Sequence, residues 1–107
     1  MKIEILHVPG CPHLQPAAQL VEKLLLEEGV LAEVQQVSVA DEATAAALRF
    51  AGSPTVLVNG RDVEPEVVVG QAGLSCRLYA NPGAPGIPSR DALLRAIRES
   101  ATVAGGR

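Results

Sequence analysis

Aromatic side chains are scarce in this chain of 107 residues, which contains one Phe, one Tyr and no Trp. A chain of this length forms one domain with a single core. Because 48% of the residues are hydrophobic but only 2% are aromatic, that core must consist of Leu, Val, Ile and Ala. We expect residues 1–101 to form the domain and residues 102–107 to form a flexible tail.

The sequence also lacks an excess of positive charge and a long apolar run. Its net charge is -3 and charges of both signs are interspersed, which leaves no basic stripe for nucleic acid and no basic amphipathic helix for a membrane surface. No apolar run is long enough for a signal peptide or a membrane span. We therefore expect a cytoplasmic protein that binds neither nucleic acid nor membranes, and the sequence leaves its oligomeric state open.

Cysteine is scarce as well, since the chain has two, Cys11 and Cys76. Two cysteines in a cytoplasmic chain are more often reactive or metal-binding than joined in a structural disulfide. Residues 3–8 have the pattern of a strand, and apolar residues recur at helical spacing over residues 14–25. Cys11 therefore lies where a strand turns into a helix. Gly29 is expected to end this helix in a left-handed conformation.

The start of that helix favours a thiolate at Cys11. The first helical N–H groups have no partners, and the helix dipole places about half a positive charge there. Pro12 suits the first helical position because its missing N–H would be unpaired there. His13 either faces solvent or carries positive charge near the thiol. Cys11 is thus the candidate nucleophile, although a free cysteine can also pack as a small hydrophobic residue.

The rest of the chain alternates between strand and helix patterns. Asn59-Gly60 predicts a type I′ hairpin turn, and residues 65–88 form a long Gly/Pro-rich loop that carries Cys76. A loop of this length in a small domain is usually functional or disordered. Taken together, these patterns predict an α/β fold whose strands and helices follow in the order βαβαββα. Its later elements are a strand over 31–39, a helix capped by Asp41 and closed by Gly52, a strand over 53–58, a return strand from Asp62 and a helix capped by Ser89.

Two motifs in this order resemble the thioredoxin-like superfamily. They are Gly10-Cys11-Pro12-His13-Leu14 and Gly52-Ser53-Pro54-Thr55-Val56. The resemblance implies a central mixed four-stranded sheet flanked by about three helices, with a cis-proline at Pro54 opposite the active-site Cys11. It also implies that the backbone beside Ser53 pairs with a bound peptide or thiol. Leu14 stands where such proteins usually carry a resolving cysteine, which argues against a general disulfide reductase.

A narrower resemblance lies in the last third of the chain. Asp62-Val63-Glu64-Pro65, followed by Gly73-Leu74-Ser75-Cys76-Arg77-Leu78-Tyr79, resembles small bacterial thioredoxin-like proteins that are labelled as related to alkylmercury lyase. Such lyases cleave a carbon–mercury bond with two cysteines and an aspartate. The resemblance implies Cys11 and Cys76 as ligands for Hg(II) or another soft metal, with Asp62 or, less directly, Asp91 as the acid. It implies no other cofactor.

Three functions are compatible with these features. The first is thiol redox chemistry, in which Cys11 attacks a disulfide, sulfenate or glutathione adduct, Pro54 frames the substrate, and Cys76 or glutathione resolves the product. The second is capture or cleavage of a mercurial by both cysteines. The third is a non-catalytic interaction module, which requires a buried and inert Cys11. We favour the first, with a small thiol, disulfide or mercurial, or a protein thiol, as the partner.

The role of Cys76 stays open between two alternatives. Cys76 packs under the side chains of Leu74, Leu78 and Tyr79, or the loop folds back and brings Cys76 to Cys11. In the second alternative Arg77 would stabilise a thiolate or bind an anionic group. In the first, Arg77 is a solvated charge.

Overall fold

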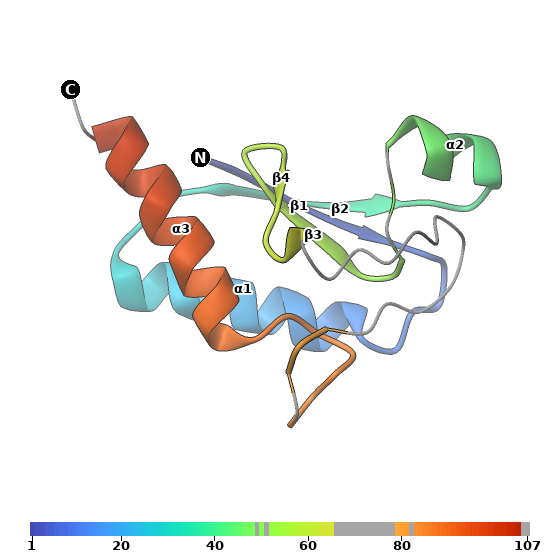
Figure 1. The fold of residues 1–107 in the computed structure, drawn as a ribbon, viewed down its shortest axis with the longest axis horizontal. Coiled ribbons are helices and arrows are strands. Elements are labelled where there is room, and N and C mark those ends of the chain that lie inside the picture. The colour runs from blue at the N-terminus through green and yellow to red at the C-terminus, as the bar shows by residue number, and fades with distance from the viewer. Residues whose placement is uncertain (49, 51, 66–78, 82, 106–107) are drawn as a thin grey trace.

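The computed structural model describes residues 1–48, 50, 52–65, 79–81 and 83–105 (Figure 1). Within these ranges the order of elements is the predicted βαβαββα. The elements are β1 (Lys2–His7), α1 (Leu14–Glu28), β2 (Glu33–Ser38), α2 (Glu42–Ala47), β3 (Thr55–Val58), β4 (Arg61–Asp62) and α3 (Arg90–Gly105). None of the helices in the described part combines the length and the apolar composition that crossing a membrane requires.

The four strands form one mixed sheet in the order β2-β1-β3-β4. β1 runs parallel to β2, and β3 runs antiparallel to both β1 and β4. This confirms the expected mixed four-stranded sheet. In the β1–β3 pair Leu6 lies opposite Thr55, so the C-terminal end of β1 and the N-terminal end of β3 lie at the same end of the sheet. The segments that follow β1 and precede β3 therefore start side by side.

Alternation along the strands divides the core between the two faces of the sheet. Ile3 and Ile5 point to the face where α1 and α3 pack, and their cluster includes Val21, Leu24 and Leu93. Leu6 points to the opposite face and packs with a second cluster that includes residues of α2 and its flanks. Figure 1 shows α1 and α3 on one side of the sheet and α2 on the other. The fold is therefore a three-layer α/β arrangement.

The turns with left-handed residues lie where the sequence predicts them. Gly29 ends α1 with φ 65°, and its N–H donates to the carbonyls of the last turn. Asn59 and Gly60 both have positive φ, 51° and 83°, which is the type I′ geometry. The hairpin turn and the end of the first helix are thus confirmed.

Helix α2 is shorter than its sequence pattern indicates. Asp41 caps it as predicted, but the helix ends at Ala47 and Gly52 does not close it. Phe50 lies beyond the helix, is fully buried, and packs with Leu6, Val39 and Ala45. The chain leaves the helix early because the aromatic ring fills the core between α2 and the sheet.

The Asp41 cap gives the protein a testable pH dependence. The Asp41 side chain accepts a hydrogen bond from the Thr44 N–H at 2.7 Å, and this bond is the main cause that lowers the pKa of Asp41. A carboxyl whose pKa is lower in the folded state stabilises the fold above its unfolded pKa, and this stabilisation is lost as pH falls through the folded pKa. We expect Asp41→Asn, which retains a good cap, to lose less stability than the unsubstituted protein below about pH 4. Urea unfolding from pH 7 to pH 2.5 measures the free energy of unfolding of both proteins. An equal loss of that free energy in the two proteins as pH falls would contradict the prediction.

Helix α3 begins as predicted but extends further. Ser89 caps it, because its Oγ accepts from the Ala92 N–H at 3.1 Å. The helix runs to Gly105, so residues 102–105 are helical where we expected a flexible tail. No proline or glycine interrupts the sequence between Ser89 and Gly105, so nothing local stops the helix earlier.

Candidate functional site

Cys11 lies in a backbone-bonded turn between β1 and α1. Its N–H donates to the Val8 carbonyl at 3.2 Å, and its own carbonyl accepts from the Leu14 N–H at 3.3 Å. Gly10 has φ 75°, a left-handed conformation that glycine adopts without strain. We call residues Val8–Leu14 the thiol turn. Its cysteine is a free thiol of intermediate exposure.

The thiol turn differs from the predicted helix start. Helix α1 begins at Leu14, with His13 as a cap whose side chain makes no capping bond. Pro12 therefore precedes the cap instead of occupying the first helical position, and Cys11 lies in the turn before the helix. The cause is the Leu14–Cys11 backbone bond, which spans three residues, whereas the first bond of helical span runs from Ala17 to His13.

The segment before β3 is tied directly to the thiol turn. Ser53 is fully buried, and its Oγ accepts a hydrogen bond from the Val8 N–H at 3.0 Å. The Ser53–Pro54 peptide bond is cis, which is the conformation that the family resemblance implied. Since Val8 is three residues before Cys11, this bond holds the cis-proline segment and the cysteine at the same end of the sheet.

Tyr79 connects a third segment to this end of the molecule. Its buried hydroxyl donates to the Pro54 carbonyl at 2.5 Å, and its N–H donates to the Pro85 carbonyl at 2.8 Å. The sequence pattern predicted no role for Tyr79 in the site. The available signal was that the single tyrosine of the chain stands in a Gly/Pro-rich loop, since a buried tyrosine needs a partner for its hydroxyl.

Glu64 anchors the same loop from the hairpin side. This side chain is 5% exposed, and its two oxygens accept from the Ala80 N–H at 3.3 Å and the Ser89 N–H at 3.4 Å. Ser89 is also the cap of α3. The Glu64 carboxyl thereby fixes both the residue after Tyr79 and the start of the last helix, a contact that sequence reasoning also missed.

His13 packs against Gly86. A Cβ added at Gly86 would lie 2.6 Å from two atoms of the His13 ring. This distance is too short for any real contact, so the glycine is required for the imidazole to occupy its present place. The loop that contains Tyr79 and Gly86 therefore contacts both the cis-proline segment and the thiol turn.

We expect Gly86→Ala to displace the His13 ring and to destabilise the protein by about 1–3 kcal/mol, as overpacking does. Gly83→Ala is the matched control, because a Cβ there would meet nothing within 4 Å. The measurements are urea unfolding and the NMR shifts of the His13 ring protons. Removing the ring with His13→Ala should reduce the effect of Gly86→Ala. Equal effects of Gly83→Ala and Gly86→Ala would show that the contact has no energetic role.

The remaining candidate residues divide into two groups. Cys76, Arg77 and most of the 65–88 loop lie outside the described residues. Asp62, proposed as an acid, accepts from the Glu64 N–H at 2.8 Å, and Asp91 is an exposed residue in the first turn of α3. Among the described residues no three His, Cys, Asp or Glu side chains are grouped so that they could hold a metal ion.

The sequence was compared with known proteins. It matches no protein-family model, and a search of curated proteins returned no significant relative.

Proposed function

We propose that this chain is a thioredoxin-like thiol protein in which Cys11 carries out thiol–disulfide exchange. The observation that carries the proposal is the juxtaposition of a partly exposed free thiol with a cis-proline segment at one end of a mixed sheet. The Val8–Ser53 hydrogen bond makes this juxtaposition direct. The partial exposure of Cys11 favours this function over a non-catalytic module, which requires a buried thiol.

The chemistry needs one attacking thiolate and a second thiol. The Cys11 sulfur attacks one sulfur of a substrate disulfide, a Cys11–substrate disulfide forms, and the other substrate sulfur leaves as a thiolate. A second thiol then attacks the mixed disulfide and releases Cys11. Leu14 cannot supply that thiol, so the resolving group is Cys76 or external glutathione. Pro54 frames the substrate on the side opposite Cys11.

The direct test uses the folded, unsubstituted protein. Glutathione disulfide is added at neutral pH, and the modified residue is identified by peptide mapping and mass spectrometry. We expect Cys11 to be modified without denaturant, as a glutathione adduct or, if Cys76 resolves that adduct, as a Cys11–Cys76 disulfide. Modification of Cys11 only after unfolding would exclude the proposed function.

A parallel sample with one equivalent of Hg(II) separates the mercury function from redox exchange. Two soft thiolates that bind one ion would be protected together from alkylation. Joint protection of Cys11 and Cys76 would favour the mercurial substrate. Protection of neither, together with a glutathione adduct on Cys11, would favour disulfide exchange.

A further inference from the structure

The outer edge of β2 is open in the described part of the chain. β2 is the end strand in the order β2-β1-β3-β4, and among the described strands it pairs only with β1. The Glu33 N–H donates to the Met1 carbonyl at 2.9 Å, and the Val39 N–H donates to the His7 carbonyl at 2.7 Å. These two bonds identify the odd-numbered residues of this segment as those whose backbone groups face β1.

The even-numbered residues of β2 face the opposite way. Successive residues of a strand direct their N–H and C=O groups to alternate sides. Since the odd-numbered residues bond to β1, Val34, Gln36 and Ser38 direct both groups toward the outer edge. Such a row of backbone groups is a template for pairing with a further strand.

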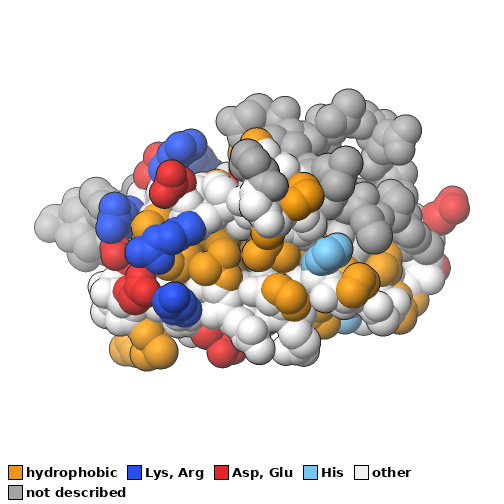
Figure 2. Space-filling view, turned by 90° about the horizontal axis from the view of Figure 1, so that it is seen from below, with side chains coloured by type: hydrophobic (Ala, Val, Ile, Leu, Met, Phe, Trp, Pro, Cys, Tyr) orange, Lys and Arg blue, Asp and Glu red, His pale blue; other side chains and the backbone are white. Residues whose placement is uncertain are grey.

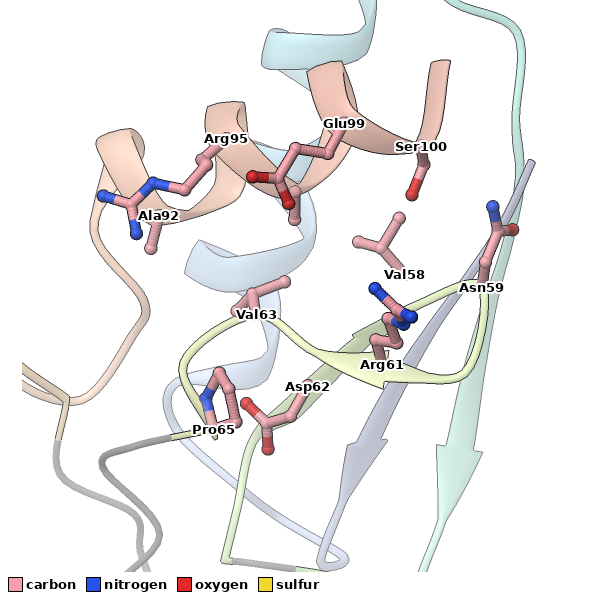
Figure 3. Close-up of a pocket in the computed structure, with 11 residues that line it drawn as sticks. Val58, Asn59, Arg61, Asp62, Val63, Pro65, Ala92, Arg95, Glu99 and Ser100 are labelled. Carbon is pink, nitrogen blue, oxygen red and sulfur yellow. The ribbon is translucent and has the colours of Figure 1, made fainter. Parts of the chain in front are cut away.

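The other edge of the sheet is protected against such pairing. β4 has two residues, Arg61 and Asp62, both charged, and the Asp62 carboxylate accepts from the Glu64 N–H at 2.8 Å. Figure 3 shows this hairpin beside α3, with β1 and β2 beyond it. Shortness and charged side chains both protect an edge strand. β2, in contrast, has six residues and no proline, and its one charged residue, Glu33, stands at its start.

The face of the molecule that carries α1 and α3 has its own charges paired. Arg90 donates to Glu27 at 2.9 Å, and Arg98 donates two bonds to Glu28 at 2.8 and 3.1 Å. Figure 2 views this face and shows basic and acidic side chains intermingled at its left. These pairs leave no surplus of one charge there that would recruit a partner.

We propose that two copies of this chain form a dimer in which their β2 strands pair antiparallel about a two-fold axis. Residues that exchange hydrogen bonds across an antiparallel pair must both direct their backbone groups toward the partner. One register uses all the outward residues of both copies. It places Gln36 opposite Gln36 of the second copy, and Val34 opposite Ser38. This register forms about six backbone hydrogen bonds and joins the two sheets into one.

The side chains of β2 fit this register. Glu33 lies at the outer end of the pairing in each copy, so no two acidic side chains of β2 face each other. The Gln36 side chains meet at the two-fold axis, where each amide can both donate and accept. A two-fold interface requires a surface that matches itself, which β2 provides. Apart from Glu33 the strand has no charged side chain that would select a chemically different peptide.

Leu31 adds an apolar contact at each end of the pairing. It lies two positions before β2 and is 94% exposed. In the proposed register it lies beside the end of the second copy's β2, where Ala40 is also exposed. Removal of these side chains from water favours association.

Sedimentation equilibrium of the full chain tests the proposal over a wide range of protein concentration. A reducing agent is present throughout, so that no disulfide joins two copies. We expect a reversible equilibrium between monomer and dimer. Gln36→Lys places like charges opposite each other at the axis and should raise the dissociation constant of the dimer by about tenfold or more. The matched control Gln19→Lys makes the same change at an exposed position of α1 and should alter that constant by less than about threefold.

Gln36→Pro tests the backbone pairing itself. It removes the outward N–H at the axis, which makes no bond to β1, so an edge strand tolerates it. It should also weaken the dimer by about tenfold or more. The thermal unfolding midpoint at low concentration checks the fold, and Gln36→Lys decides the question if the proline variant does not fold. Glutathione should modify Cys11 in Gln36→Lys at the unsubstituted rate, because the dimer uses no residue of the thiol turn.

Amide hydrogen exchange locates the interface. At high protein concentration the N–H groups of Val34, Gln36 and Ser38 should gain protection that they lack on dilution, whereas those of Gln35 and Val37 should be protected at both concentrations. This alternation is specific to pairing along the outer edge of β2. A monomer at every concentration, a dimer that neither Gln36 variant weakens, or protection gained away from the outward residues would overturn the proposal.

Discussion

Replacing Cys11 by serine should abolish the glutathione adduct at the thiol turn and remove all thiol–disulfide exchange by the folded protein. Serine keeps nearly the same size and leaves the backbone bonds from Cys11 to Val8 and Leu14 in place. An unchanged thermal unfolding midpoint would show that the fold is preserved. The loss should be complete, because a hydroxyl cannot form the mixed disulfide.

Cys76→Ser is the control that separates attack from resolution. If Cys76 resolves the mixed disulfide, this variant should accumulate the Cys11–glutathione adduct, as measured by mass spectrometry after a fixed time. If external glutathione resolves it, the adduct should decay at the rate of the unsubstituted protein once reduced glutathione is added. Full exchange activity in Cys11→Ser would assign the chemistry to Cys76 and refute the role of the thiol turn.

Glu64→Ala should give the largest loss of stability among the polar substitutions considered. The alanine removes the acceptor of two part-buried N–H groups, those of Ala80 and Ser89, and a hydrogen bond to a charged group contributes about 1.5–3 kcal/mol. We expect a total loss of about 2–4 kcal/mol, because both bonds are long. The free energy of urea unfolding measures it.

Two further variants serve as controls for Glu64→Ala. Glu64→Gln keeps one oxygen and should lose less stability than Glu64→Ala, since its amide can still accept from one of the two N–H groups. Glu22→Ala removes an exposed glutamate of α1 and should change stability by less than about 0.5 kcal/mol. A loss in Glu64→Ala no larger than that in Glu22→Ala would mean that water satisfies the freed donors.

The features that the sequence predicted correctly depend on short-range signals. The Asn59-Gly60 turn and the Asp41 and Ser89 caps are set by residues within a few positions of each other. The element order follows from apolar periodicity, which reports the buried faces of each helix and strand. These signals were sufficient for the order of strands and helices and for the location of the cysteine after β1, whereas the mixed four-stranded sheet was expected from the family resemblance.

Two of the missed contacts depend on partners distant in the sequence. The Tyr79–Pro54 and Glu64–Ser89 bonds each join residues 25 positions apart, and no local pattern marks either pair. The early end of α2 goes with the burial of Phe50 against Leu6 and Val39, which no local pattern marks. The start of α1 was predicted too early. A turn closed by a backbone bond between residues three apart and a helix closed by bonds between residues four apart require nearly the same sequence near Pro12 and His13. Conversely, the cis bond at Pro54 was expected from family resemblance and not from composition.

The position of β1 in the sheet has a consequence for how the chain is made. β1 leaves the ribosome before β2 and β3, yet it lies in the interior of the sheet between them. Its β2 side can be covered as soon as residues 33–38 emerge, but its β3 side stays unpaired until residues 55–58 follow. An unpaired strand that contains Ile3, Ile5 and Leu6 is a site of aggregation during this interval. Synthesis that pauses between β2 and β3 should therefore lower the yield of folded protein more than a pause after β4.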